Sequence, residues 1–267
     1  MSSVAARVLE SIRINLDPVA FVRERMGVEP EGWQADILRD SERRICITCS
    51  RQIGKSFTVS LKASQHCATT PDGLALIFSD TQQQSINLMR KAKQHIEHAG
   101  LPIRKELRTE IEFLNGARMV ALPGDPKTSR SWSDVTMLIV DEAAFAEDEL
   151  YYAVEPMVLQ TNGQIILLSS AYETTGFFYK IATGDDPYWS RYRVTVWESE
   201  RVPREWIERK QLLTPDYQFR REYLAEFVDP EGATFTAEQI RDMFDNDILP
   251  LGEEGEHTIM NPEVEAL

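Results

Sequence analysis

The stretch that decides the fold reads Ile45-Cys46-Ile47-Thr48-Cys49-Ser50-Arg51-Gln52-Ile53-Gly54-Lys55-Ser56. Its first half is a short run of β-branched and apolar residues without a helical period, which predicts a buried strand. Its second half ends in Gly-Lys-Ser, and the apolar spacing that follows predicts the start of a helix. A strand, a tight loop and a helix N-terminus together bind anions, because backbone N–H groups and the positive end of the helix dipole face the bound group. The stretch therefore predicts a phosphate-binding loop.

Each residue at the end of this loop has an expected role. Gly54 lets the backbone approach a phosphate closely. Lys55 is expected to reach the β- and γ-phosphates, and the Ser56 hydroxyl is expected to bind Mg²⁺. The usual pattern begins with a glycine, whereas this chain has Cys49 at that position. A chance Gly-Lys-Ser at a helix start is the plain alternative.

A second motif is an apolar run, Val135 to Val140, that ends in two consecutive carboxylates, Asp141 and Glu142. Because side chains alternate along a strand, the two carboxylates point in different directions. We expect Asp141 to hold the magnesium ion, usually through water, and Glu142 to polarise the water that attacks the γ-phosphate. A buried strand that ends in a solvated acidic turn is the alternative.

The conjunction of the two motifs predicts the fold class. A phosphate loop, an intervening strand and an apolar strand ending in Asp-Glu are the layout of additional-strand, catalytic-glutamate ATPases. The expected fold is therefore an α/β P-loop NTPase of this RecA/helicase-like type, with a mainly parallel central sheet flanked by helices.

The remaining elements follow from hydrophobic periodicity and from turn residues. Further strands are expected at 74–79, at 163–171 and at 191–197, with a hairpin over 111–122 whose turn is Asn-Gly. Helices are expected at 4–16, 18–26, 80–99, 205–213 and 217–227. Ser169 and Ser170 end one strand, at the sheet edge where ligands bind, so they could sense a γ-phosphate; a small-residue turn is the alternative.

Trp33 and Gln34 precede the phosphate loop and resemble an adenine-recognition element. A glutamine amide can pair with both the donor and the acceptor on the adenine edge, and an aromatic ring can stack on the base. The alternative is a helix with a buried tryptophan and a solvent-facing glutamine. The sequence leaves both open.

Composition excludes several classes of protein. The chain has 267 residues and a formal net charge of −14, which argues against broad coating of nucleic acid but leaves room for one basic patch. No apolar run approaches a membrane span, and Met1 to Val4 lacks a secretory pattern. Cys46, Cys49 and Cys67 are interpreted as small core residues in a reducing cytoplasm.

These residues resemble a known family, the large terminase subunit of tailed double-stranded DNA bacteriophages. The resemblance covers roughly Gly32 to Phe235. Its most specific parts are the Arg-Gln before Gly54, which accounts for the missing first glycine, and the Asp-Glu-Ala-Ala-Phe that ends at Phe145. The matching segments are Ser50 to Ser56, Arg130 to Asp134, Leu138 to Phe145 and Leu168 to Ala171.

The resemblance implies an ATP-driven motor that moves viral double-stranded DNA into a procapsid through the portal. It implies ATP and Mg²⁺ as cofactors, with Ser169, Ser170 and Ala171 as the motif that couples hydrolysis to DNA movement. The ATP-binding residues would be Trp33, Gln34, Ser50, Arg51, Gln52, Ile53, Gly54, Lys55, Ser56 and Phe57. The catalytic residues would be Glu142, Lys55, Arg130 and Arg51.

The resemblance also implies partners and a location. Expected partners are the viral DNA, the portal protein, the small terminase subunit and further copies in a ring, a pentamer on the procapsid, with a monomer when isolated. The expected location is the host cytoplasm, transiently at the procapsid portal and not in the mature virion.

The expected domains are an ATPase core with an N-terminal helical extension over 1–202, a lid and linker over 203–248, and an acidic tail over 249–267. Members of the family usually carry a C-terminal nuclease domain. No long apolar strand with carboxylates follows Asp229, so no nuclease activity is expected from this chain.

Two arginines compete for a transition-state role worth ~10³–10⁵ in rate. Arg51 lies within the loop and could act in cis. Arg130 lies in a serine-rich stretch and could reach a neighbour's nucleotide in a ring; we favour Arg130 in trans and Arg51 as a phosphate contact or sensor. An ordinary surface arginine is the alternative for each.

Contact with DNA is expected from a small basic cluster, Arg104, Lys105 and Arg108. A solvated charged face is an equal alternative. Two other functions compete with the motor: a helicase-like nucleic-acid-dependent ATPase, which would need a second nucleotide-binding core, and a nucleotide-binding switch or assembly adaptor, against which Glu142 beside Asp141 argues.

Overall fold

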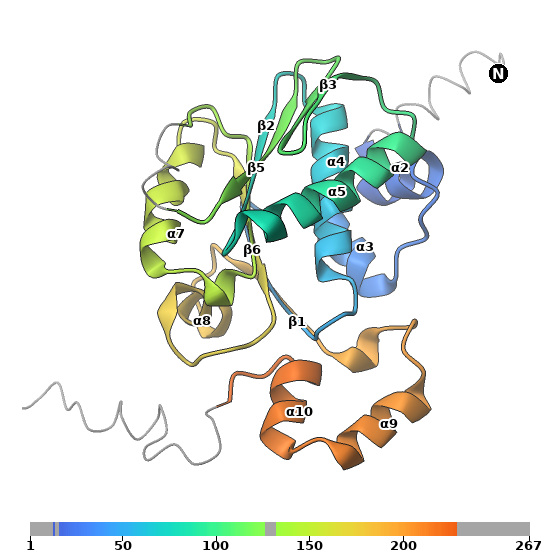
Figure 1. Ribbon diagram of the computed structural model, residues 1–267, viewed down its shortest axis with the longest axis vertical. Helices are drawn as coiled ribbons and strands as arrows, with labels where there is room; N and C mark the ends of the chain where they lie inside the picture. Colours follow the sequence, from blue (N-terminus) through green and yellow to red (C-terminus); the bar gives the residue numbers. More distant parts are fainter. Residues whose placement is uncertain (1–12, 14–15, 126–131, 229–267) are drawn as a thin grey trace, which may run out of the picture. The chain divides into compact units, whose positions relative to one another are not determined.

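The chain is described by a computed structural model that covers residues 13, 16–125 and 132–228 (Figure 1). Its centre is an eight-stranded sheet in the order β3-β4-β5-β2-β6-β7-β1-β8. The strands are β1 Arg44–Cys49, β2 Leu74–Ser79, β3 Ile103–Glu106, β4 Glu110–Phe113, β5 Arg118–Pro123, β6 Met137–Asp141, β7 Gln164–Ser169 and β8 Ser190–Val194. In this spatial order, all neighbouring strands between β5 and β8 pair in parallel, and the antiparallel pairs are β3 with β4 and β4 with β5. This topology confirms the predicted fold class.

Helices cover both faces of the sheet, as Figure 1 shows, with α4 and α5 on one side and α7 and α8 on the other. Their bounds are α2 Pro18–Arg25, α3 Gly32–Arg39, α4 Lys55–Thr69, α5 Gln82–His98, α7 Asp148–Val154, α8 Gly176–Thr183, α9 Arg204–Leu213 and α10 Asp216–Tyr223. Short 3₁₀ turns follow at Ala143–Phe145, Glu155–Val158 and Val196–Glu198.

Alternation along β1 explains the two layers. Ile45 and Ile47 pack with α4 and α5, whereas Cys46 packs with α8 on the opposite face. β2 and β6 are buried along their whole length. Because helices cover both faces of the sheet there, these two strands have nearly continuous apolar sequences. All three cysteines are buried, and burial raises the pKa of each thiol to about 12.

The predicted hairpin is confirmed at its turn. β4 and β5 pair in antiparallel register, and the Ala117 carbonyl accepts a 2.8 Å hydrogen bond from the Phe113 N–H. Gly116 has a φ of +86°, a left-handed conformation that glycine adopts at little cost.

Three predicted elements end at least two residues earlier than expected. β7 stops at Ser169, whereas the sequence predicts a strand to 171. β8 stops at Val194 because Thr195 caps the next turn, with its hydroxyl accepting from the Trp197 N–H. α10 stops at Tyr223, and Ala225 beyond it has a φ of +52°. The helix expected over 4–16 falls almost wholly outside the described residues, as does the tail from 229, so the domain boundaries remain predictions. Across the described residues, every helix falls short of the length and apolarity needed to span a bilayer.

The topology brings the motifs to one edge. In parallel strands all carboxyl ends meet at the same side of the sheet. β1 ends at Cys49 beside β7, which ends at Ser169, and β7 lies beside β6, which ends at Asp141. The loop after Cys49 therefore faces the acidic pair.

Candidate functional site

The phosphate loop runs from the end of β1 to the start of α4, and its backbone depends on one glycine. Gly54 has a φ of +110°, and a Cβ there would lie 3.2 Å from Gln34 Nε2. Gln52 also has a positive φ, of 61°. Ile53 between them is buried, which anchors the loop to the core. The loop thus holds a left-handed conformation at the position where the sequence predicts close backbone approach.

Lys55, the first residue of α4, points at the end of β6. Its Nζ donates a 2.9 Å hydrogen bond to Glu142 Oε1 and lies 3.5 Å from Ser170 Oγ. The lysine side chain is only 11% exposed and that of Glu142 is 25% exposed, so solvent screens the pair weakly. The structure therefore joins the loop, the acidic pair and the end of β7 through one ammonium group.

Glu142 follows β6 in a strained backbone conformation, with φ 55° and ψ 42°. This left-handed region costs a non-glycine residue on the order of 1 kcal/mol, and such strain concentrates at functional sites. It turns the Glu142 carboxylate toward β7, where Ser169 Oγ donates to Oε2 at 3.3 Å. Ala171, the third residue of the predicted coupling motif, is buried just beyond.

Asp141 and Ser56 form an oxygen-rich pair. Ser56 Oγ lies 3.3 Å from Asp141 Oδ2. Asp141 is only 5% exposed, and burial, followed by the charge of Glu142, raises its pKa to about 6. A buried carboxylate of this kind is stabilised as the anion by a cation, and carboxylate and hydroxyl oxygens are ligands that Mg²⁺ accepts. These two residues fit the predicted magnesium site.

Lys55, Glu142 and Ser170 border a hollow of about 370 Å³. It is lined by Arg51, Gln52, Lys55, Asp80, Gln84, Glu142, Phe145 and Ser170. Asp80, Gln84 and Phe145 were not predicted, although Asp80 follows a buried parallel strand and thus comes to the same edge. The volume suits a phosphate group, for which Arg51 and Lys55 are the cations in the lining.

The loop is also tied to α10. Arg51 Nε lies 2.6 Å from Glu222 Oε2, and the Glu222 carbonyl accepts from the Arg51 N–H and from Ser50 Oγ. Arg51 is 56% exposed on its side chain and borders the hollow. Glu222 was missed because nothing local in the sequence marks a residue whose partner lies so far away.

The structure corrects the expectation for Trp33. Its ring is 8% exposed and belongs to the core, and its Nε1 donates to Glu31 Oε2 at 2.7 Å. The first turn of α3 directs the indole inward, so it is the buried tryptophan of the alternative and does not stack on a base. Gln34, in contrast, is fully buried, and its Nε2 lies against Gly54, so the solvent-facing alternative for Gln34 is wrong. Phe57 lies half-buried on α4, edge-on to His95.

The side chains of the predicted DNA cluster are already engaged in contacts within the chain. Arg104 pairs with Glu112 and Lys105 with Glu110, and Arg108 donates to Gln83. These are exposed contacts of small energy, so DNA binding there stays a prediction. Arg130 lies outside the described residues, and its role also stays a prediction.

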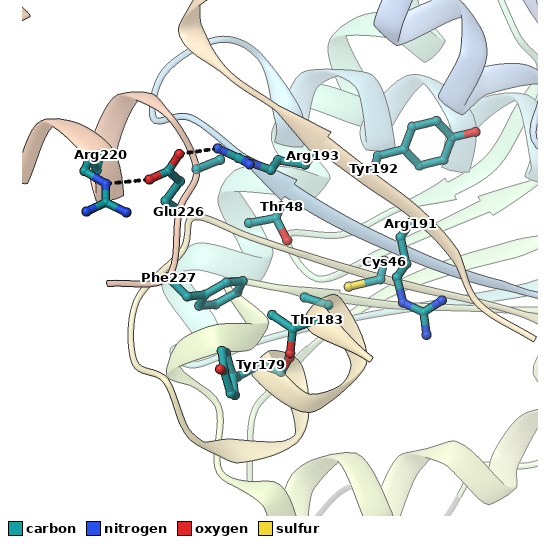
Figure 2. A pocket seen from close by; sticks show the side chains of 12 residues that line it. Cys46, Thr48, Tyr179, Thr183, Arg191, Tyr192, Arg193, Arg220, Glu226 and Phe227 are labelled. Carbon is teal, nitrogen blue, oxygen red and sulfur yellow. Dashed lines mark hydrogen bonds and ion pairs between the residues drawn. The ribbon is translucent and has the colours of Figure 1, made fainter. Parts of the chain in front are cut away.

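A separate cavity of about 420 Å³ opens on the other face of β1 (Figure 2). Figure 2 shows Glu226 between Arg193 and Arg220, at 2.7 Å and 2.6 Å, so the two cations are already paired. None of the residues 50–57 lines it. This cavity is not the phosphate site.

Comparison with known proteins agrees with this geometry. The family model described as "Terminase large subunit, T4likevirus-type, N-terminal" matches residues 46–242. The terminase large subunit of Thermus virus P23-45 is 23% identical over 250 residues, 80% of this chain and 52% of that protein. That of Escherichia phage T5 is 26% identical over 233 residues, 82% of this chain and 52% of that protein. The chain thus spans about half the length of these curated relatives.

Solved structures share the fold. The large terminase ATPase domain of Thermus phage P74-26 has a TM-score of 0.70 and 21% identity, and the match covers 79% of this chain and 99% of that one. The large terminase of another thermophilic bacteriophage, in complex with ADP, has a TM-score of 0.67 and 15% identity, with 82% of this chain and 57% of that one covered. At these identities the likeness establishes the architecture.

Proposed function

This chain belongs to the family of T4-like-virus-type terminase large subunits, and we propose that it is the ATP-hydrolysing motor domain that drives viral double-stranded DNA into a procapsid. The relatives named above are terminase large subunits, and one solved relative binds ADP. The reaction proposed is the hydrolysis of ATP by water to ADP and phosphate.

One observation carries the proposal. Lys55, at the start of α4, and Glu142, at the end of β6, meet at 2.9 Å beside a hollow large enough for phosphates. A general base must lie within hydrogen-bond reach of the water that it activates, and the phosphate cation must lie next to that water's target. The position of the pair beside the hollow, at one edge of the sheet, supports both roles.

The roles of the side chains follow from their positions. Lys55 is a point charge for the β- and γ-phosphates, and a triphosphate attracts its ammonium more strongly than a single carboxylate does. When Lys55 turns to the nucleotide, Glu142 loses its partner and can accept a proton from water. Ser169, which donates to Glu142, holds the carboxylate in place. Ser170, next to Lys55, is suited to register the γ-phosphate.

Asp141 and Ser56 would hold Mg²⁺, which when bound neutralises charge that develops on the phosphates. The support is the 3.3 Å approach of the two oxygens and the burial of the carboxylate. Arg51, on the border of the hollow, is proposed as a phosphate contact, and Arg130 as a finger that acts on a neighbouring subunit.

The partners proposed are double-stranded DNA, the portal protein, the small terminase subunit and further copies of the chain in a pentameric ring. The proposed location is the host cytoplasm at the procapsid portal. These assignments rest on the family alone.

Packaging in vitro tests the proposal. Purified chain, extended where needed to the full-length protein, is mixed with portal-bearing procapsids, linear DNA and MgATP, and DNA protected from nuclease is measured together with phosphate release. We expect protection that requires ATP hydrolysis and that disappears with Glu142→Gln. ATP turnover without any DNA protection by the full-length protein contradicts the motor, and strand separation of duplex DNA favours the helicase-like alternative.

A further inference from the structure

A second hollow adjoins the phosphate site. It measures about 650 Å³ and lies between the phosphate loop and the helices α9 and α10. Arg51 and Gln52 line both this hollow and the smaller one beside Glu142, so the two meet at the loop. Trp206 and Tyr223 contribute aromatic surface from the helical side. A flat base and a ribose attached to phosphates on the loop could extend into this space.

Arg201 stands in the wall of this hollow, next to the loop. Its guanidinium lies over the Phe57 ring at 5.4 Å, and its Nη1 lies 4.0 Å from where a Cβ on Gly54 would be. Its Nε lies 3.0 Å from Glu31 Oε1, and the Glu31 side chain is only 5% exposed, while 49% of the Arg201 side chain remains exposed. The guanidinium is therefore fixed on one side and open on the other.

Gln34 completes this fixation. Its Oε1 accepts the Glu31 backbone N–H at 2.9 Å and lies 3.5 Å from Arg201 Nη2. Because both neighbours are donors, the carboxamide oxygen must face them, and the amide nitrogen faces Gly54 without a hydrogen-bond partner among the described residues. The side chain is fully buried and is not among the residues that line the hollow, whereas Arg201 lines it.

We propose that Arg201 is the residue that contacts the nucleotide base, and that Glu31 and Gln34 act through it as positioning residues. A planar guanidinium held over one aromatic ring presents its other face for stacking, and it does so without loss of side-chain freedom at binding. Of the cations that line the hollow, Arg51 pairs with Glu222 and Arg201 with Glu31, and Lys210 lies over the Trp206 ring, so the lining offers guanidinium and ammonium groups to a nucleotide. The inference rests on the proposed function, because it assigns the base end of the ATP whose phosphates the loop would hold.

Two probes separate the base from the phosphates. Calorimetric titration measures the Kd of the imido analogue of ATP and of inorganic tripolyphosphate, both with Mg²⁺, for the wild type, Arg201→Ala, Arg201→Lys and a matched control, Arg204→Ala. Arg204 is a neighbouring arginine whose guanidinium lies over Trp197. Stacking on a flat side chain is worth roughly 5- to 100-fold in affinity per base.

We expect Arg201→Ala to raise the Kd of the ATP analogue about tenfold and to change the Kd of tripolyphosphate less than twofold. Arg201→Lys keeps the charge but loses the planar guanidinium, so it should raise the Kd of the analogue at least fivefold. Arg204→Ala should leave the Kd of both ligands unchanged. Gln34→Ala should weaken the analogue less than Arg201→Ala, and the double variant should match Arg201→Ala.

Other results overturn the assignment. An analogue Kd within twofold of the wild type in Arg201→Ala removes Arg201 from the base site. An equal loss for tripolyphosphate shows that Arg201 acts on the loop. A wild type that binds neither ligand overturns the proposed ATPase function itself, which distinguishes the two failures.

Discussion

Lys55 Nζ and Glu142 Oε1 lie 2.9 Å apart although 87 positions separate the two residues in the chain. The ion pair is three-quarters or more buried on both sides. Each charge satisfies the other in the absence of nucleotide, so the proposed cation and the proposed base are both occupied. We expect a γ-phosphate that binds Lys55 to compete with Glu142 for its ammonium group, which would free the carboxylate when a substrate is present.

The first prediction concerns Glu142→Gln. An amide cannot accept a proton from water, so we expect ATP hydrolysis to fall about 10²–10⁴-fold, whereas ATP binding is retained or tightened because the carboxylate no longer competes for Lys55. Phosphate release and equilibrium nucleotide binding measure the two effects. Glu149→Gln, on the exposed face of α7, is the matched control and should hydrolyse ATP at the wild-type rate. Hydrolysis within a few-fold of the wild type in Glu142→Gln contradicts the assignment.

The second prediction concerns Asp141→Asn and pH. Burial raises the pKa of this carboxyl from 3.8 to about 6 in the folded chain, so the folded state favours the protonated form. The resulting destabilisation is fully present above pH 6 and fades as pH falls through 6 toward 4. Without nucleotide, Asp141→Asn should therefore be more stable than the wild type at pH 8, by on the order of 3 kcal/mol, and the gain should shrink by pH 5.

Thermal unfolding across pH measures the stability difference between Asp141→Asn and the wild type. We expect Mg²⁺-ATP to reverse the sign of this difference. The ligand should stabilise the wild type strongly and the variant little, because the amide is a poor magnesium ligand. A variant that is less stable than the wild type at pH 8 without ligand speaks against a cation site at Asp141.

The third prediction compares two glycines with positive φ. Gly54→Ala combines strain with a contact of 3.2 Å to Gln34 Nε2, whereas Gly100→Ala at φ +58° meets nothing within 4 Å. We expect both variants to lose about 1 kcal/mol of stability from strain, and Gly54→Ala alone to lose nucleotide binding by tenfold or more. Denaturant unfolding and nucleotide titration measure the two losses. Equal nucleotide affinity in both variants shows that the loop tolerates the added methyl group.

The fourth prediction concerns the arginine finger. Arg130→Ala and Glu142→Gln subunits are each expected to be inactive, and a mixture assembled on procapsids should regain part of the turnover because each supplies what the other lacks. The matched mixture of Arg51→Ala with Glu142→Gln should regain none if Arg51 acts in cis. No recovery in the Arg130 mixture argues against trans action.

The sequence predicted the sheet well, and it predicted that the two motifs converge at one edge, because both outcomes depend on local signals. Continuous apolar runs identify β2 and β6, and Gly-Lys-Ser and Asp-Glu identify the two ends that converge. Parallel topology then brings Ser169 to the same edge. Each step needs only periodicity and the rule that ligands bind at the carboxyl ends of strands.

The sequence did not predict contacts that depend on tertiary packing. Whether Trp33 faces a base or the core is decided by how α3 packs, and the same turn buries Gln34 next to Arg201. Glu222 carries no local signal, because its importance comes from its 2.6 Å approach to Arg51. The early end of β8 reflects a capping hydroxyl at Thr195, which a strand-like alternation conceals.

A crystal structure of the chain with a non-hydrolysable ATP analogue and Mg²⁺ tests the central assignment most directly. We predict the β- and γ-phosphates against residues 52–56, Mg²⁺ near Ser56 and Asp141, and Lys55 turned from Glu142 to the γ-phosphate. An analogue bound elsewhere, such as in the cavity of Figure 2, with the Lys55–Glu142 pair intact, would contradict it.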